Sequence, residues 1–95
     1  MSVEQDVIDL VEKYDGHVFF SKRLLTITPD TDLKRDVKLA SEDAIDLLTE
    51  YAERFGIKTQ DIVFTEYFPN SRKVTPKSLT VGMLIESAKA HKWLY

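Results

Sequence analysis

The 95-residue chain contains no cysteine, which excludes disulfides, thiolate metal ligands and a cysteine nucleophile. Its three glycines are isolated from one another, so there is no glycine-rich phosphate-binding loop. No apolar run approaches the roughly 20 residues that a membrane-spanning helix needs. The amino terminus carries Glu4, Asp6 and Asp9 where a secretory signal has basic and then apolar residues. We therefore expect a cytoplasmic protein without a membrane span.

Length and charge narrow the class further. Ninety-five residues suffice for one modest core, so we expect a single domain over residues 1–95 and a monomer. The net charge of −3 argues against a nucleic-acid-binding domain, because such domains are usually basic. The charge is uneven, since Ser71–Tyr95 holds five basic residues and Glu86 as its single acid. Part of this basic segment could pair with acidic residues elsewhere in the chain.

The stretch from Leu39 to Ile57 carries the clearest helical signals. Ser41 stands where an N-cap belongs, because its hydroxyl could accept a hydrogen bond from an amide of the first turn. Gly56 stands where helices often end in a left-handed conformation. Between them, apolar residues recur at three- and four-residue steps, and these are Ala44, Leu47, Leu48, Tyr51, Ala52 and Phe55. The pattern predicts an amphipathic helix over about 41–55.

The opposite face of this helix is acidic. Glu42, Asp46, Glu50 and Glu53 follow one another at steps of three or four residues, which places them on one side. One interpretation is an ordinary solvated helix face. The other is a docking surface for a basic partner, because like charges on one face destabilise a helix and suggest another benefit.

The rest of the chain predicts further helices around this one. A first helix should span about Val3–Tyr14, with Ser2 as its cap and Asp15-Gly16 as its end. A long connection, 15–40, follows. Its apolar part, 17–25, fits either a short strand or a helical turn, and we expect Leu33, Val37 and Leu39 to anchor the remainder to the core.

The last third of the chain predicts shorter elements. We expect a short helix within 62–68, with a short strand as the competing interpretation, then a basic, exposed loop over 71–77. Thr80 should cap a final helix, and the apolar tail from Trp93 to Tyr95 should fold back on the body. Together these elements predict an all-α fold, a small bundle of three to four helices with a long first loop.

The sequence offers no catalytic constellation. Neither His17 nor His91 has a partner at metal-ligand or catalytic spacing, so we expect no metal site and no enzyme. Ser41 lacks a nearby base and would serve as a helix cap, but a serine at a helix start is also accessible to covalent modification.

A series of short motifs runs in order along most of the chain, and these are Ile27-Thr28, Leu33, Asp36-Val37, Ser41, Phe55-Gly56-Ile57 and Thr80-Val81-Gly82. In this order they resemble the pattern of the acyl carrier proteins, small four-helix bundles that carry acyl chains on a 4′-phosphopantetheine arm. The family pattern opens with Val/Ile-Thr, an apolar residue and Asp-Leu-Gly. Asp-Ser-Leu then stands at the head of an acidic second helix that ends in Phe-Gly-Ile, and the last helix begins with Thr-Val-Gly.

Three positions depart from this pattern. Lys38 replaces the glycine before the motif, and Glu42 replaces a leucine that the modifying transferase and partner enzymes contact. Ala40 replaces the aspartate that in the family helps to position the metal and coenzyme A for the transferase. The stretch 61–69 and the tryptophan-containing tail resemble a divergent, functionally uncharacterised bacterial branch, in which the serine is often lost.

The resemblance implies a site and a function. Ser41 would bear 4′-phosphopantetheine, and the acidic helix, through Glu42, Asp46, Glu50 and Glu53, would dock basic surfaces of acyl-transferring or modifying enzymes. Acyl chains, as in fatty acid or polyketide metabolism, would enter between the helices among residues such as Leu47, Leu48 and Ile85. The alternative is a carrier fold that is never modified and acts as a protein-interaction or regulatory module through the same helix.

Overall fold

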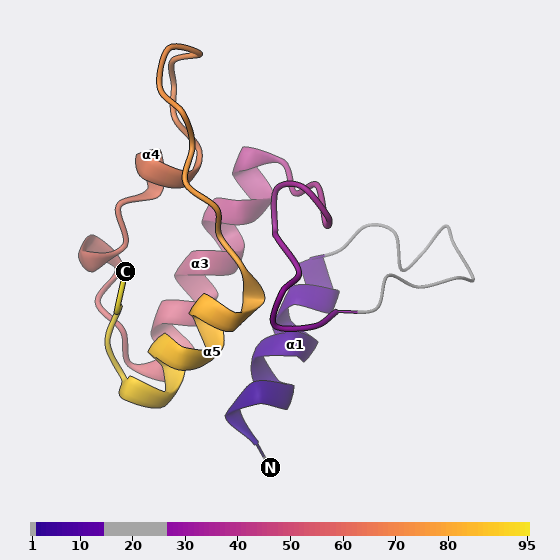
Figure 1. The fold of residues 1–95 in the computed structure, drawn as a ribbon. Helices are drawn as coiled ribbons and strands as arrows, with labels where there is room; N and C mark the ends of the chain where they lie inside the picture. The colour runs from indigo at the N-terminus through magenta and orange to yellow at the C-terminus, as the bar shows by residue number, and fades with distance from the viewer. Residues whose placement is uncertain (1, 15–26) are drawn as a thin grey trace.

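The structure, a computed structural model, describes residues 2–14 and 27–95 (Figure 1). Its α-helices are α1 (Val3–Tyr14), α3 (Ser41–Phe55), α4 (Phe64–Tyr67) and α5 (Val81–Ala90), with a 3₁₀ turn η1 at Thr59–Asp61. Helix α1 packs against both α3 and α5. The described ranges hold no strand beyond one isolated bridge, so the predicted all-α bundle is confirmed. None of the helices in these ranges has the length and apolar character needed to cross a bilayer.

Helices α1 and α3 form as their sequences predict. Ser2 caps α1, because its Oγ accepts a hydrogen bond from the Gln5 amide at 3.1 Å. All six residues of the predicted α3 stripe are buried, and all but Ala44 belong to one hydrophobic cluster with Val7, Leu10 and Val11 of α1. Gly56 ends α3 in the left-handed conformation, with φ of 71°. The predicted end of α1 at Asp15-Gly16, the two interpretations of 17–25 and His17 lie outside the described residues.

The start of α3 differs from the prediction in one respect. The N-cap is Ala40, whose carbonyl accepts the first helical hydrogen bond from the Ala44 amide at 2.9 Å, and it has no side-chain cap. Ser41 is therefore the first residue with helical geometry, so the prediction that Ser41 caps the helix is wrong. A hydroxyl one residue inside the helix is not placed to accept from the amides that an N-cap side chain reaches.

The end of the long connection is fixed to the start of α5 by backbone hydrogen bonds. The Leu33 amide donates to Leu79 O at 2.9 Å, and the Val81 amide donates to Thr31 O at 2.9 Å. The Gly82 amide donates to Pro29 O at 2.8 Å, so close that a Cβ on Gly82 would lie 3.0 Å from that oxygen. This contact explains a glycine in the first turn of α5, where helix propensity alone disfavours it.

A tight turn leads from this pairing to α3. The Asp32 carboxylate accepts from the amides of Lys34 and Arg35, and the Asp36 carboxylate accepts from the Asp32 amide at 2.8 Å. The hydrogen bond from the Asp32 amide and then the bond from Arg35 lower the pKa of Asp36. Lys38 follows in the left-handed conformation, with φ of 60°, at the position where the acyl carrier pattern has glycine. Leu33 and Val37 are buried and Leu39 packs against the core, as predicted.

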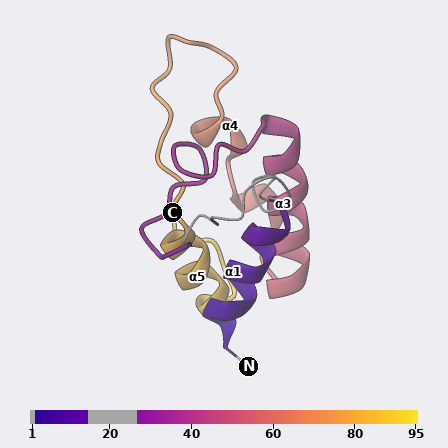
Figure 2. The ribbon, with the colours of Figure 1, turned by 90° about the vertical axis from the view of Figure 1, so that its right-hand side faces the viewer.

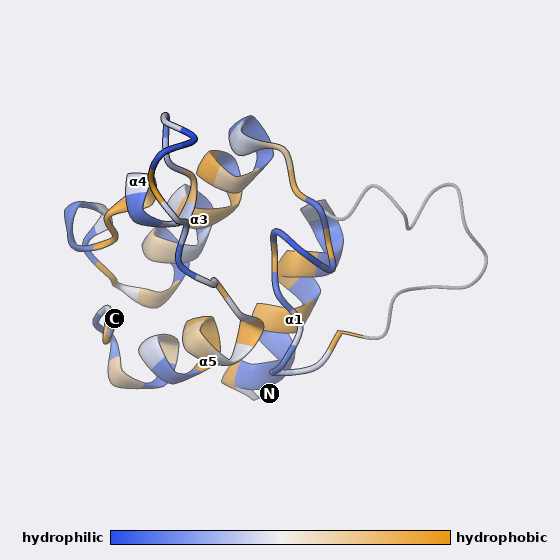
Figure 3. Ribbon diagram, turned by 45° about the horizontal axis from the view of Figure 1, so that its top comes forward, coloured by the Kyte–Doolittle hydropathy of each residue, from blue (hydrophilic) through white to orange (hydrophobic). Residues whose placement is uncertain are grey.

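The last third of the chain closes the other side of the bundle. The segment predicted as a short helix within 62–68 forms α4 and not a strand. The exposed loop that follows α4 projects from the end of the bundle where α3 begins (Figures 1 and 2) and is mostly hydrophilic (Figure 3). Thr80 caps α5 as predicted, because its Oγ1 accepts from the Met83 amide.

The tail folds back through its tryptophan. The Trp93 ring meets Tyr51 and Tyr67 edge-on, with centroids 6.5 Å and 6.1 Å away. Leu94 and Tyr95 stay about half exposed. The prediction for this tail therefore holds for Trp93 more than for the two residues after it.

The left-handed turn at Lys38 predicts a stabilising substitution. A side chain in this conformation costs about 1–2 kcal/mol, which glycine does not incur, although glycine is also freer in the unfolded chain. Lys38→Gly should therefore raise the free energy of unfolding by about 0.5–1 kcal/mol, measured by urea denaturation. Lys58→Gly is the matched control: Lys58 has φ of −76°, so that variant should be no more stable than the native protein. Equal effects of the two variants would contradict the account.

Candidate functional site

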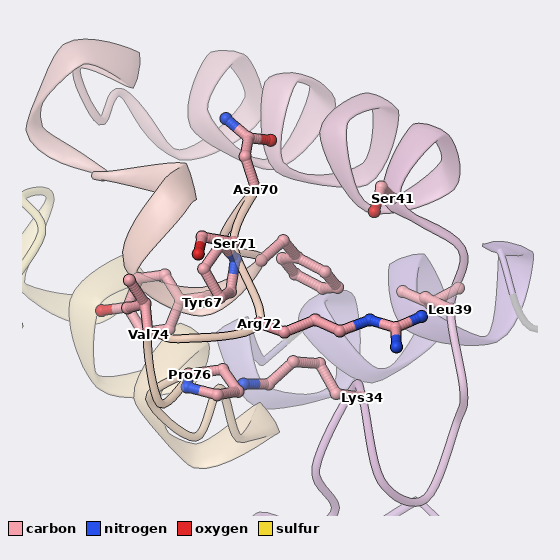
Figure 4. Close-up of a pocket in the computed structure, with 11 residues that line it drawn as sticks. Lys34, Leu39, Ser41, Tyr67, Asn70, Ser71, Arg72, Val74 and Pro76 are labelled. Atoms are coloured by element: carbon pink, nitrogen blue, oxygen red, sulfur yellow. The ribbon is translucent and has the colours of Figure 1, made fainter.

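Ser41 lies at the edge of a cleft of about 650 Å³ (Figure 4). One side of the cleft comes from the segment that leads into α3, through Lys34, Leu39 and Ser41. The other side comes from the end of α4 and the loop after it, including Asn70 and Arg72. Ser41 itself is exposed. The fold thus places the predicted attachment residue in a solvent-open cleft.

The charge of the cleft is of one sign. Lys34 and Arg72 line it, and none of the described residues that line it carries a carboxylate. The Lys34 ammonium donates a hydrogen bond to the Lys77 carbonyl and lies 5.9 Å from the centroid of the Phe68 ring, which ties it to the loop. In a chain with 16 acidic and 13 basic side chains, this cleft is a locally cationic site.

Three of the four acids predicted to dock a partner are exposed on α3, and these are Glu42, Asp46 and Glu53. The fourth, Glu50, is bonded to α1. Its carboxylate accepts from Lys13 Nζ at 2.9 Å and from the Tyr14 hydroxyl at 2.8 Å. The exposed acidic surface of α3 is therefore smaller than the sequence predicts.

The pKa values at this contact reflect the same bonds. The hydrogen bond to Glu50, desolvation and nearby carboxylates of α3 raise the pKa of Tyr14 to about 12. The hydrogen bonds from Lys13 and Tyr14 lower the pKa of Glu50. The basic carboxyl-terminal segment pairs elsewhere in the described chain, where Lys77 forms an ion pair with Glu66 of α4 at 3.2 Å.

A second depression, an apolar groove of about 300 Å³, lies between α3 and the segment that contains η1 and α4. It is lined by Ile45, Leu48, Thr49, Thr59, Ile62 and Phe64. Ile45 keeps 48% of its surface exposed. Of the residues predicted to surround an acyl chain, Leu48 lines this groove, whereas Leu47 and Ile85 are buried in the core.

Sequence reasoning missed the partners of Ser41 in the cleft. Lys34 and Arg72 are far apart in the chain. The basic composition of the loop after α4 was a signal for Arg72, and nothing in the sequence pointed to Lys34. Ile45 could have been found, because it is a large apolar residue outside the buried stripe of α3.

His91 is the residue that ends α5, at its C-cap position. It takes the left-handed conformation with φ of 58°, and its ring Nδ1 lies 3.2 Å from the Phe55 carbonyl. Within the described ranges, no three side chains of His, Asp or Glu come together as metal ligands.

The Glu50 contact predicts a pH-dependent contribution to stability. The pKa of Glu50 is below its ordinary 4.5 in the folded protein, so the contact stabilises above that pH and is lost as the pH falls through the folded-state pKa. Glu50→Gln should lower the free energy of unfolding at pH 7, and the difference from the native protein should narrow at pH 3, measured by urea denaturation. Glu53→Gln, at an exposed site on the same helix, is the control and should show little change at either pH. A difference for Glu50→Gln that is constant between pH 7 and 3 would contradict the assignment.

The comparisons with known proteins identify a family, and its description gives the function as unknown. No curated protein and no solved structure matches the chain. One family model matches residues 1–95, which is the whole chain, and its description is "Protein of unknown function (DUF1493)". The chain therefore belongs to the DUF1493 family.

Proposed function

We propose that this protein is an acyl-carrier-like protein that bears a 4′-phosphopantetheine arm on Ser41. The observation that carries the proposal is the position of this serine. It is the exposed first residue of a 15-residue helix, it opens onto a cleft, and it does not serve as the helix cap. An exposed serine without the expected capping role, at the place where the carrier pattern has its attachment residue, is well suited to covalent modification.

The electrostatics of the cleft support a phosphodiester on this hydroxyl. The amides of the first turn of α3 point toward the helix start, where the helix dipole favours negative charge. Lys34 and Arg72 add two cationic side chains to the same cleft. A phosphate group attached to Ser41 would therefore lie in a favourable field.

The apolar groove supports a role with acyl chains. Ser41, Ile45 and Leu48 follow one another along α3 at steps of four and three residues, so they share one side of the helix. The groove lined by Ile45 and Leu48 thus begins one helical turn beyond the attachment residue. An acyl group on the arm could shelter its first methylenes there, because burial contributes about 0.8 kcal/mol per CH₂ group.

The exposed acids of α3 would supply partner recognition. Glu42 and Asp46 lie to one side of the line that joins Ser41 to the groove, and Glu53 continues the acidic surface on that side. Basic surfaces of acyl-transferring or modifying enzymes would approach this face, with fast association that is sensitive to salt. The protein itself would be a carrier and not an enzyme.

A second candidate function is an unmodified carrier fold that acts as an interaction or regulatory module. Ala40 favours it, because this N-cap residue has no carboxylate to help hold the metal and coenzyme A of a modifying transferase. The same acidic face of α3 and the exposed Ile45 beside it would then form the interaction surface.

The proposal predicts a covalent change in mass. Intact protein from its native host, or protein incubated with a pantetheinyl transferase and coenzyme A, should gain about 340 Da, and Ser41→Ala should abolish the gain. Ser71→Ala is a matched control, because Ser71 lines the same cleft and should not affect labelling. A mass that stays unmodified with an active transferase present would contradict the carrier proposal and leave the interaction module.

The docking surface predicts a charge-dependent encounter. Glu42→Lys with Asp46→Lys should weaken binding of the apo-protein to a pantetheinyl transferase about ten-fold at low salt and less at high salt, measured by surface plasmon resonance. Glu4→Lys with Asp30→Lys changes the net charge equally at exposed sites outside α3 and serves as the control. If both pairs of substitutions weaken binding equally, the net charge alone explains the loss of affinity, and α3 is not the docking surface. Glu50 is left native because it holds α1.

A further inference from the structure

The cleft beside Ser41 combines features that point to one kind of ligand. Lys34 and Arg72 come from segments far apart in the chain, yet they line the same cavity with Ser41. Among the ion pairs formed within the described residues, neither cation is matched with a carboxylate. The loop over 69–77 contains no acid, and of its three basic residues Arg72 lines the cleft, whereas Lys77 is paired with Glu66. In an acidic protein, a cleft whose charged lining residues are Lys34 and Arg72 favours an anionic ligand.

We propose that Arg72 holds the phosphodiester through which the pantetheine arm is joined to Ser41, while Lys34 adds positive charge at the other end of the cleft, so that the arm leaves the helix along the basic loop. This inference rests on the carrier function proposed above, and it adds the residues that fix the arm. A phosphodiester keeps one negative charge and two unesterified oxygens at neutral pH. The guanidinium of Arg72 can donate two parallel hydrogen bonds to such oxygens. The Lys34 ammonium donates to the Lys77 carbonyl and points toward Pro76 in Figure 4, so it contributes its charge from the far end of the cleft.

The two cations differ in how they are placed. Lys34 is held by the Lys77 carbonyl and by the Phe68 ring, so its position depends on the loop. Arg72 is exposed and its side chain extends along the cleft in Figure 4, on the side where Leu39 and Ser41 lie. The loop after α4 therefore fixes both cations in the cleft: it supplies Arg72 itself, and its Lys77 carbonyl holds the Lys34 ammonium.

Ala40 is consistent with this arrangement. A carboxylate at position 40 would stand next to Ser41 and compete with the phosphodiester for the two cations. A methyl group in that place leaves the positive charge of the cleft to the phosphate. The same residue that departs from the acyl carrier pattern thus fits a cleft that binds the attached phosphate.

The test is phosphorus-31 NMR of the modified protein, with the mass of the same sample recorded first. Restricted motion of a held phosphodiester broadens its resonance, so Arg72→Gln should narrow the line about two-fold or more, and raising the salt concentration should do the same. Lys73→Gln is the matched control, because Lys73 neighbours Arg72 in the loop but does not line the cleft, and its line should stay broad. Lys34→Gln should narrow the line less than Arg72→Gln does, because the Lys34 ammonium points toward Pro76 and not toward Ser41.

The outcomes separate the two proposals. A protein that gains the arm but shows the same narrow line in the native, Arg72→Gln and Lys73→Gln forms overturns the cleft proposal and leaves the carrier function intact. A protein that a transferase cannot modify overturns both. Coenzyme A titrated into Ser41→Ala tests the free ligand. Suppose that coenzyme A binds Ser41→Ala only when Arg72 is present, whereas Arg72→Gln leaves the phosphorus line of the modified protein unchanged. The cleft would then bind the incoming coenzyme A and not the attached phosphodiester, which would also overturn the proposal.

Discussion

Three backbone hydrogen bonds between residues 29–33 and 79–82 hold the end of the long connection against the start of α5. They convert a segment that would otherwise be costly to order into a fixed part of the fold. The positions of Lys34, of the turn at Lys38 and of Ser41 all follow from this pairing, because each lies a few residues beyond it. The same pairing fixes where the loop from α4 re-enters the body, so both sides of the cleft have one common support.

Local signals were enough for the helices. The buried stripe of α3, the caps at Ser2 and Thr80 and the left-handed Gly56 depend on residues within a turn of one another, and each was predicted. The cap at Ser41 failed because a shift of one residue in backbone geometry decides which side chain stands over the first amides. The cleft could not be predicted, because Lys34 and Arg72 meet only through tertiary contacts. The reason for a glycine at position 82 is likewise not local, since it is the close contact with Pro29.

The charged side chains on and around α3 have different roles that depend on where they lie. Glu50 is used inside the fold, where it accepts bonds from α1, and so it contributes to the packing of α1 on α3. Glu42 and the cations of the cleft lie near the amino-terminal end of that helix, whereas Glu53 lies near its other end. A partner that approaches Glu42 would therefore meet the basic loop nearby. An acidic and a basic region side by side can set the orientation in which a partner binds, which net charge alone cannot do.

The left-handed backbone at Lys38 lies three residues before Ser41, the residue on which the carrier proposal depends. A strained non-glycine residue persists where the surrounding structure determines its conformation, and such residues often lie near functional sites. Here the strain falls between the Asp32–Asp36 turn and the first residue of α3, so this turn sets the direction in which the helix begins. Under the carrier proposal, that direction decides where the arm on Ser41 would lead. An unmodified module would instead depend on residues such as Ile45, Asp46 and Leu48, which lie further along α3.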